Sequence, residues 1–110
     1  MAARYELKRS RDQKYYWTLQ ADNNEVLLTS ETYASKGNAE NGVASAKRNS
    51  SSEGNYDRRN ASNTQYYFVL RAGNNEVLGT SEMYTTAWAR DNGITACKQV
   101  GPKAPTSDLT

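Results

Sequence analysis

The stretch from Tyr15 to Tyr33 reads YYWTLQADNNEVLLTSETY, and it returns 51 residues later, from Tyr66 to Tyr84, as YYFVLRAGNNEVLGTSEMY. Thirteen of the nineteen aligned positions are identical, without a gap. The similarity continues outward, since Asn-Gly-Val at 41–43 matches Asn-Gly-Ile at 92–94. Self-similarity at a fixed period indicates a repeat architecture. We therefore predict a single domain over residues 1–110, built of repeat 1 at 4–50, repeat 2 at 55–101 and a C-terminal tail at 102–110.

Hydrophobic periodicity predicts the strands of each copy. Trp17, Leu19 and Ala21 alternate with polar residues, which is the period-two pattern of a half-buried strand. The Asn23-Asn24 pair that follows suits a tight hairpin turn, because asparagine tolerates positive φ. The chain then returns as a third strand over residues 25–29. A weaker first strand contains Tyr5, and its polar surroundings predict a place at the edge of the sheet.

Beyond these strands the apolar spacing changes to that of a helix. Ala39, Val43 and Ala46 recur at i, i+4 and i+7, and Ser35 is the expected N-cap. In copy two, Ile94 and Cys97 hold the matching places, with Ala87 and Trp88 ahead of them, and Thr85 or Thr86 is the expected cap. Each copy therefore ends in an amphipathic helix.

A glycine lies inside each predicted helix, at Gly42 and Gly93. In a helix interior glycine costs about 1 kcal/mol relative to alanine. A glycine kept in both copies indicates that a strand or the other helix passes too close to leave room for a Cβ atom.

A unit of about 50 residues has too small a core to fold unaided. The two copies should therefore pack together. The predicted fold class is α+β: two tandem β-β-β-α(-β) repeats related by a pseudo-twofold axis, which form one antiparallel-rich sheet with two helices packed on it. The tail at 102–110 contains both prolines of the chain and is expected either to be disordered or to add a short edge strand.

The sequence resembles the YegP-like family of small bacterial proteins of unknown function. The resemblance covers residues 4–101 and rests on the strand-turn-strand segment 19–26 with its twin 70–77, on the two Ser-Glu-x-Tyr motifs, and on the two Asn-Gly motifs. It implies β-β-β-α-β-like halves that share one sheet and exchange their terminal strands. It implies no catalytic or binding residues.

Composition excludes several classes of function. The chain has 14 basic and 12 acidic residues, a balance too close to neutrality to indicate a nucleic-acid partner by itself. A single cysteine and no histidine exclude an internal disulfide and a Cys/His zinc cluster. No phosphate-binding loop, signal sequence or membrane span is recognisable. We expect a cytoplasmic protein with no cofactor, no metal and no contact with a membrane.

The Ser-Glu-x-Tyr motifs are the first candidate site, because they are polar and kept in both copies. They predict a capping and corner structure, in which serine accepts from a helix N–H and tyrosine anchors a turn. The catalytic alternative pairs Glu31 with Glu82 across the pseudo-twofold as the acid and base of a hydrolase. The motif residues are Ser30, Glu31, Tyr33, Ser81, Glu82 and Tyr84.

Aromatic and basic strand residues form a second candidate site. Bases of a single-stranded nucleic acid could stack on Tyr16 and Tyr67, while basic residues such as Arg58 and Arg59 contact phosphates. The structural alternative is a set of cross-strand pairs on a half-buried sheet with charged residues guarding its edge.

A third hypothesis is a module whose strand edge or sheet face receives a protein partner. No serine nucleophile has a histidine beside it, so an enzyme is not expected. We predict a monomer, because the tandem copy already supplies the partner surface, and a binding or structural role with a protein rather than catalysis.

Overall fold

The computed structural model describes residues 2–110, which form seven strands, two α-helices and one short 3₁₀ helix. In copy one, β1 (Arg4–Arg9), β2 (Tyr15–Gln20) and β3 (Val26–Ser30) precede α1 (Lys36–Asn49). After the 3₁₀ turn η1 (Glu53–Asn55), copy two follows as β4 (Tyr56–Asn60), β5 (Tyr66–Arg71), β6 (Val77–Thr80) and α2 (Ala87–Val100), and β7 (Thr106–Asp108) comes last. The predicted α+β class and tandem organisation are confirmed.

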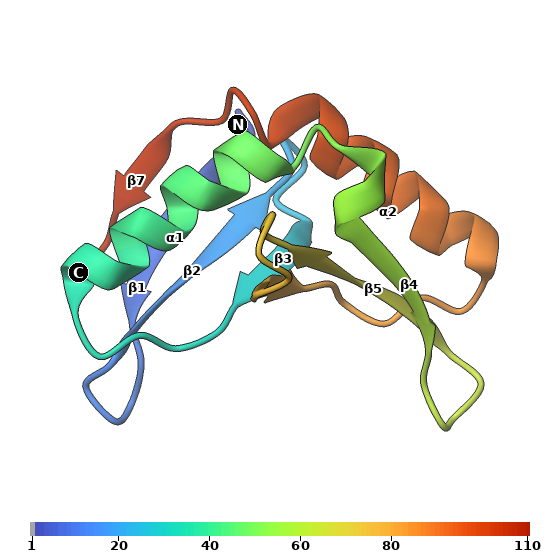
Figure 1. Cartoon of the computed structure of the whole chain (residues 1–110), viewed down its shortest axis with the longest axis horizontal. Helices are drawn as coiled ribbons and strands as arrows, with labels where there is room; N and C mark the ends of the chain where they lie inside the picture. The colour runs from blue at the N-terminus through green and yellow to red at the C-terminus, as the bar shows by residue number, and fades with distance from the viewer. Residues whose placement is uncertain (1) are drawn as a thin grey trace.

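All seven strands join one sheet in the order β4-β5-β6-β3-β2-β1-β7. Every neighbouring pair is antiparallel except β1 and β7. The two copies meet at β3 and β6, where Thr29 pairs with Thr80, its own counterpart in the repeat. Because equivalent residues pair on antiparallel strands, the pseudo-twofold axis passes through this point, perpendicular to the sheet. Figure 1 shows the resulting arch, with a long hairpin descending on each side and the C-terminal ends of the two helices meeting at the top.

The four hairpin turns share one geometry, in which the third loop residue has a positive φ. These residues are Gln13, Asn24, Thr64 and Asn75. The turn at Asn24 closes through its N–H on the carbonyl of Ala21 at 2.9 Å, and the N–H of Ala21 reaches the carbonyl of Glu25 at 2.9 Å. This is the three-residue hairpin loop in which a type I turn is followed by a left-handed residue. Asparagine suits that position, as the sequence predicted, whereas a β-branched residue such as Thr64 is rare there.

A β-bulge in the third strand of each copy enlarges the core. On β3, Leu28 pairs with Leu19 and Val26 with Gln20, so Leu27 is an extra residue without a partner. Leu27 and Leu28 are nevertheless both buried. The bulge therefore turns two consecutive residues toward the helices, which strict alternation would not allow. The same irregularity recurs in β6.

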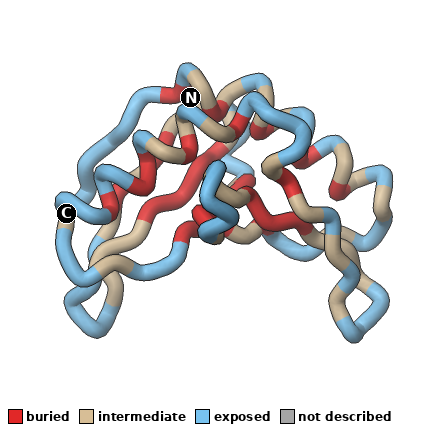
Figure 2. The backbone as a smooth tube through the Cα atoms, viewed as in Figure 1, coloured by how far each residue is buried: buried red, intermediate tan, exposed pale blue. Residues whose placement is uncertain are grey.

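The core lies between the sheet and the two helices, which share one face of it. Figure 2 shows the buried stretches along the central strands and the inward sides of both helices. Its largest members are aromatic and occupy matched positions in the two copies. Tyr5 meets Trp17 edge to face with 5.5 Å between ring centroids, and Tyr56 meets Phe68 in the same way at 5.7 Å. Such pairs add about 0.5–1.5 kcal/mol to the gain from burial.

The two helices begin as predicted and bury matched positions, but Trp88 does not belong to the inward face of α2. Ser35 Oγ accepts from the N–H of Asn38 at 3.1 Å, and Thr86 Oγ1 accepts from the N–H of Ala89 at 3.0 Å. Trp88, placed by the sequence with the core-facing residues, is 75% exposed. Trp88 corresponds to Gly37 of copy one, which is not among the residues that α1 buries.

The C-terminal tail forms an edge strand, and this corrects the predicted place of β1. β7 runs parallel to β1, with the N–H of Tyr5 on the carbonyl of Pro105 and the N–H of Leu109 on the carbonyl of Leu7, both at 2.8 Å. β7 therefore covers β1. Of the two first strands that were predicted to lie at an edge of the sheet, only β4 does so. The exchange of terminal strands that the family resemblance implied occurs in one direction only. β7 of copy two pairs with β1 of copy one, whereas the segment after α1 forms η1 and leads directly into β4.

Two tyrosine hydroxyls join the copies where the helices end. Tyr5 Oη donates to the carbonyl of Gly101 at 2.9 Å, and Tyr56 Oη donates to the carbonyl of Ser50 at 2.6 Å. Each tyrosine thus binds the last turn of the helix that belongs to the other copy. A Cβ atom at Gly101 would lie 2.7 Å from Ser50 Cβ, so the two helix ends touch.

Candidate functional site

The serines of the two Ser-Glu-x-Tyr motifs are structural. Ser30 Oγ accepts from the N–H of Trp17 at 2.9 Å and donates to the carbonyl of Glu31 at 2.7 Å. Ser81 repeats this arrangement on the N–H of Phe68 at 2.9 Å and the carbonyl of Glu82 at 2.8 Å. The predicted corner motif is therefore present, but the donor is a strand amide. The prediction that these serines accept a hydrogen bond from a helix N–H was wrong, because other residues cap the helices.

The tyrosines of the motifs explain the two helix glycines. Tyr33 pairs with Tyr15 through two backbone hydrogen bonds of 2.7 and 2.9 Å, and its ring lies against α1. A Cβ atom at Gly42 would lie 2.8 Å from Tyr33 Cζ. In copy two, a Cβ atom at Gly93 would lie 2.5 Å from Tyr84 Oη. The close neighbours are thus the tyrosine of the adjoining motif and a strand side chain, Trp17 of β2 at 2.9 Å or Phe68 of β5 at 3.1 Å, so the predicted close strand accounts for part of the crowding.

The carboxylates of Glu31 and Glu82 do not form a pair. Both are exposed, and each follows the end of a central strand. Because Thr29 pairs with Thr80 on antiparallel strands, the two glutamates lie beyond opposite ends of that pair. A rise of about 3.3 Å per residue separates them by more than 10 Å. Hydrolytic carboxylate pairs lie about 5–9.5 Å apart, so the predicted acid/base pair is wrong.

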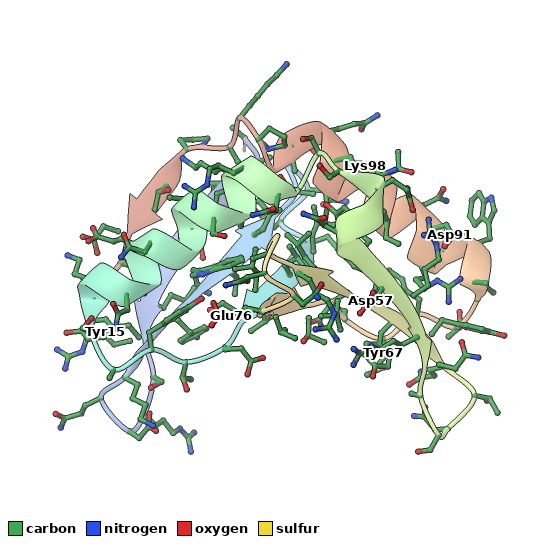
Figure 3. All side chains as sticks on the ribbon, in the orientation of Figure 1. Tyr15, Asp57, Tyr67, Glu76, Asp91 and Lys98 are labelled. Atoms are coloured by element: carbon green, nitrogen blue, oxygen red, sulfur yellow. The ribbon has the colours of Figure 1, made fainter. Side chains whose placement is uncertain are left out.

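The face of the sheet opposite the helices carries the second candidate site. Lys8 pairs in register with Tyr16, and Arg59 pairs with Tyr67, its counterpart in copy two. Because Trp17 faces the helices, Tyr16 faces the opposite side. Figure 3 shows Tyr67 and Asp57 together in the half that copy two forms. The structure therefore places a cation beside a half-buried tyrosine in both copies, as the nucleic-acid hypothesis requires.

The cations of this face are bound to carboxylates. Arg4 and Lys8 contact Glu6 at 2.9 and 3.3 Å. In copy two, Arg59 contacts Asp57 at 3.4 Å and Arg71 hydrogen-bonds the same carboxylate. Arg71 and then Arg59 lower the pKa of Asp57. Each cluster therefore exposes an excess of one positive charge at most, a weak field for a polyanion.

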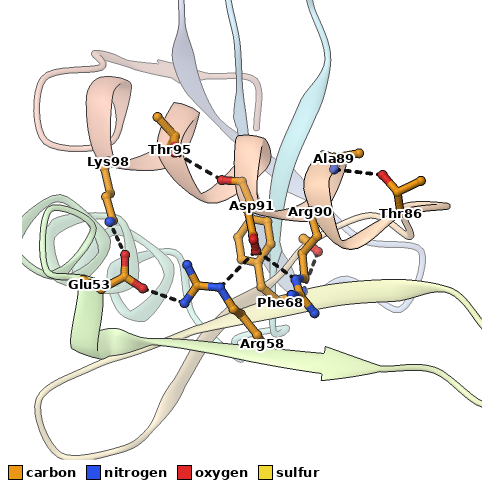
Figure 4. Close-up of polar contacts among 10 residues, drawn as sticks. Glu53, Arg58, Phe68, Thr86, Ala89, Arg90, Asp91, Thr95 and Lys98 are labelled. Carbon is orange, nitrogen blue, oxygen red and sulfur yellow. Dashed lines mark hydrogen bonds and ion pairs between the residues drawn. The ribbon is translucent and has the colours of Figure 1, made fainter.

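Arg58 does not belong to this face, which corrects its assignment to the nucleic-acid site. It pairs with Phe68 and lies on the side of α2. Its guanidinium contacts Glu53 at 2.6 Å and Asp91 at 3.0 Å, and Lys98 also contacts Glu53 (Figure 4). This network joins η1, β4 and α2, and it uses Arg58 as a structural residue.

A hollow of about 340 Å³ lies where α1 meets the β5–β6 hairpin of the other copy. We call it the junction hollow. Glu76 and Leu78 come from copy two, and all other lining residues come from copy one; Figure 3 places Glu76 near the middle of the molecule. The full lining comprises Tyr33, Asn38, Asn41, Gly42, Ser45, Glu76 and Leu78. Sequence reasoning singled out only Tyr33 of its polar groups as a site residue.

A small apolar patch was also missed. Trp88, in the first turn of α2, is 75% exposed, and Met83, in the segment that precedes α2, is 48% exposed. The matched positions of copy one hold Gly37 and Thr32. That difference between the copies is the signal that could have identified the patch. We call Met83 and Trp88 the α2 patch.

The described residues contain neither a metal-binding cluster nor a membrane-spanning helix. Within residues 2–110, no cluster of three or more acidic or cysteine side chains is arranged to hold a metal ion. No helix in the described part of the chain is long and apolar enough to cross a membrane.

Comparison with known proteins identifies the family. The family model described as a domain of unknown function (DUF1508) matches residues 10–57 and again 61–108. The chain belongs to the DUF1508 family. The two matched segments are offset by the same 51 residues as the internal repeat, so the DUF1508 unit occurs here twice in tandem.

Full-length DUF1508 relatives carry names without a function. The UPF0339 protein YegP of Escherichia coli K12 is 43% identical over all of both chains, and a UPF0339 protein of Acinetobacter baylyi is 44% identical over all of this chain and 99% of its own. This confirms the resemblance to the YegP-like family.

Solved structures confirm the fold. The solution structure of YegP from E. coli superimposes with a TM-score of 0.93 at 43% identity, covering 100% of this chain and 95% of its own. A UPF0339 protein of Shewanella oneidensis gives 0.93 at 42%, covering 100% and 93%. The E. coli structure is described as that of a protein of unknown function.

Two glycines of α1 provide a test of the tyrosine contact in this DUF1508 chain. Gly37→Ala should stabilise the protein by up to about 1 kcal/mol, because its Cβ meets open space and alanine favours the helix. Gly42→Ala should destabilise it by about 1–3 kcal/mol, because the new Cβ overlaps Tyr33. Urea unfolding measures both. Equal effects of the two substitutions would contradict the proposed role of Tyr33.

The Glu53 network predicts a pH dependence of stability. Arg58 and then Lys98 lower the pKa of Glu53 from 4.5 to about 2. The ionised carboxylate therefore stabilises the fold above its ordinary pKa, and this contribution is lost as the pH falls from about 4.5 through 2. Glu53→Gln should cost about 0.5–1 kcal/mol at pH 6, a difference that disappears near pH 2.

The control for this experiment is Glu40→Gln, because among the described residues Glu40 makes no ion pair. Its free energy of unfolding should follow that of the wild type from pH 6 to pH 2. A cost of Glu53→Gln that stays constant over this range would contradict the assignment.

Proposed function

We propose that this protein is a non-catalytic interaction module that binds a protein partner through the α2 patch. The observation that carries the proposal is the 75% exposure of Trp88, accompanied by the 48% exposure of Met83. Tryptophan and methionine are enriched in protein interfaces, and tryptophan is among the residues that supply most of the binding energy.

The patch is not needed by the repeat itself. Copy one builds the same corner and the same helix start with Thr32 and Gly37. Thr86 caps the helix through its own hydroxyl, so Trp88 contributes nothing to the cap. An exposed indole that the fold does not use is free to serve as an anchor for a partner.

A protein fits this molecule better than a nucleic acid. Single-stranded nucleic acid needs uncommitted cations beside its stacking residues. Here Glu6 and Asp57 each hold two of the cations on the open face, and Arg58 is part of a separate network. Binding of single-stranded nucleic acid through Tyr16 and Tyr67 is the outcome that would replace the proposal.

Catalysis has little support from the nucleophiles and carboxylates. Cys97 is fully buried, and burial raises the pKa of its thiol to about 12. A thiolate is therefore not available at neutral pH. The glutamates Glu31 and Glu82 are held apart by the register of the central strands.

We further propose that the protein acts as a cytoplasmic monomer. Copy two covers the β3 edge that a second protomer would otherwise fill, because β6 pairs with β3. A free, buried Cys97 also suits a reducing compartment.

Substitution at the patch tests the proposal. Tagged wild type, Trp88→Ala and the matched copy-one variant Gly37→Ala are compared by quantitative affinity purification from nuclease-treated lysate of the producing cells. Trp88 is exposed, so its loss should change the stability by no more than about 0.5 kcal/mol. A specific protein should be retained by the wild type and Gly37→Ala and lost with Trp88→Ala.

The captured protein is then purified and its binding measured by calorimetry. We expect its affinity to fall at least tenfold with Trp88→Ala and to stay unchanged with Gly37→Ala. Equal binding by all three proteins, or retention seen only when the nuclease treatment is omitted, would contradict the proposal. Concentration-dependent dimerisation of the wild type that Trp88→Ala removes would also contradict it, because the patch would then join two copies of this chain.

A further inference from the structure

The junction hollow has the features of a small-molecule site, independently of the α2 patch. It is a hollow of about 340 Å³, at the lower end of the range for ligand pockets. α1 and the Ser-Glu-x-Tyr corner of copy one form one side of it, and Glu76 and Leu78 of copy two form the other. The site is therefore complete only when both copies are present.

Most polar side chains around the hollow are not used by the fold, although Ser45 Oγ accepts from Asn49 Nδ2 at 3.2 Å. Within residues 2–110, the side chains of Asn38, Asn41 and Glu76 make no hydrogen bond or ion pair. Asn38 and Glu76 use only their backbone N–H groups as donors, to Ser35 and Asn74. Glu53 and Asp57 are bound to cations, whereas Glu76, like Glu25 and Glu40, makes no ion pair among the described residues. The lining thus offers a group of oxygen acceptors that the fold itself does not use.

The charge of the hollow is negative. Glu76 is the one ionisable carboxylate among the lining residues, and no lining residue is basic. Burial raises the pKa of Tyr33, and the negative charges of Glu76 and Glu31 add to the rise. A cation with several N–H donors matches such a set of acceptors, whereas an anion does not.

The pseudo-symmetric position shows that this polarity is not a requirement of the fold. The residues that correspond to Asn38 and Ser45 are Ala89 and Ala96. The corresponding carboxylate is kept as Glu25. The amide of Asn41 and the hydroxyl of Tyr33 recur there as Asn92 and Tyr84, so the junction hollow differs from its counterpart by the added side chains of Asn38 and Ser45.

We propose that the junction hollow binds an organic cation, an alkylguanidinium or alkylammonium group, with Glu76 as its counter-ion and Tyr33, Asn38, Asn41 and Ser45 as hydrogen-bond partners. Leu78 supplies an apolar wall for the alkyl chain. The chemistry is the same for a free diamine-like metabolite and for an arginine or lysine side chain of a peptide.

An NMR titration of the isotope-labelled full chain with agmatine at pH 7 and low salt tests the site. We expect the side-chain amides of Asn38 and Asn41 and the ring of Tyr33 to shift in a saturable way. Glu76→Gln should weaken binding at least tenfold. The matched variant Glu25→Gln removes the same charge from the equivalent turn and should leave the affinity unchanged.

Further ligands separate the possible sources and test the sign of the charge. A capped Gly-Arg-Gly peptide that binds more tightly than agmatine identifies a peptide side chain as the ligand, and the reverse order identifies a free small molecule. The proposal is overturned if neither cation shifts these resonances, or if Glu25→Gln and Glu76→Gln weaken binding equally. It is also overturned if a neutral molecule, n-pentanol or glucose, binds as tightly as agmatine.

Discussion

The structure depends on the contact between the C-terminal ends of its two helices. The last turn of an α-helix leaves carbonyl groups without partners, and burial makes such groups costly. Here Tyr5 of copy one binds the carbonyl of Gly101, and Tyr56 of copy two binds the carbonyl of Ser50. Burial raises the pKa of both tyrosines. Each copy therefore satisfies the helix end of the other, and neither can do so alone.

The remaining repeated motifs follow from this mutual arrangement. With the helix ends fixed, each helix lies close to the sheet, and Gly42 and Gly93 leave room for the tyrosine of the adjoining corner. Ser30 and Ser81 hold that corner to β2 and β5. Motifs that look functional because they occur twice are thus parts of one packing scheme, whereas Trp88 and, in the junction hollow, Asn38 and Ser45 occur in one copy only.

Local patterns in the sequence were sufficient for the elements and their ends. The strand that contains Trp17, the positive φ of Asn24 and the caps at Ser35 and Thr86 all follow from neighbouring residues. The half-buried pattern predicted for that strand was wrong, because Thr18 and Gln20 are buried on its other face. Features that depend on strand register could not be predicted in this way. The extra Leu27, the side of β4 on which Arg58 lies, and the pairing of β7 with β1 each require knowledge of which strands meet.

The central claim is that the two copies fold as one cooperative unit through the helix ends, and native-state hydrogen exchange of wild type and Gly101→Ala tests it most directly. Alanine at this position would overlap Ser50. We predict that the slowest amides of β2 and of β5 share one free energy of opening in the wild type, and that the substitution lowers both by the same amount. Loss of protection in β5 alone, with β2 as protected as before, would contradict the account.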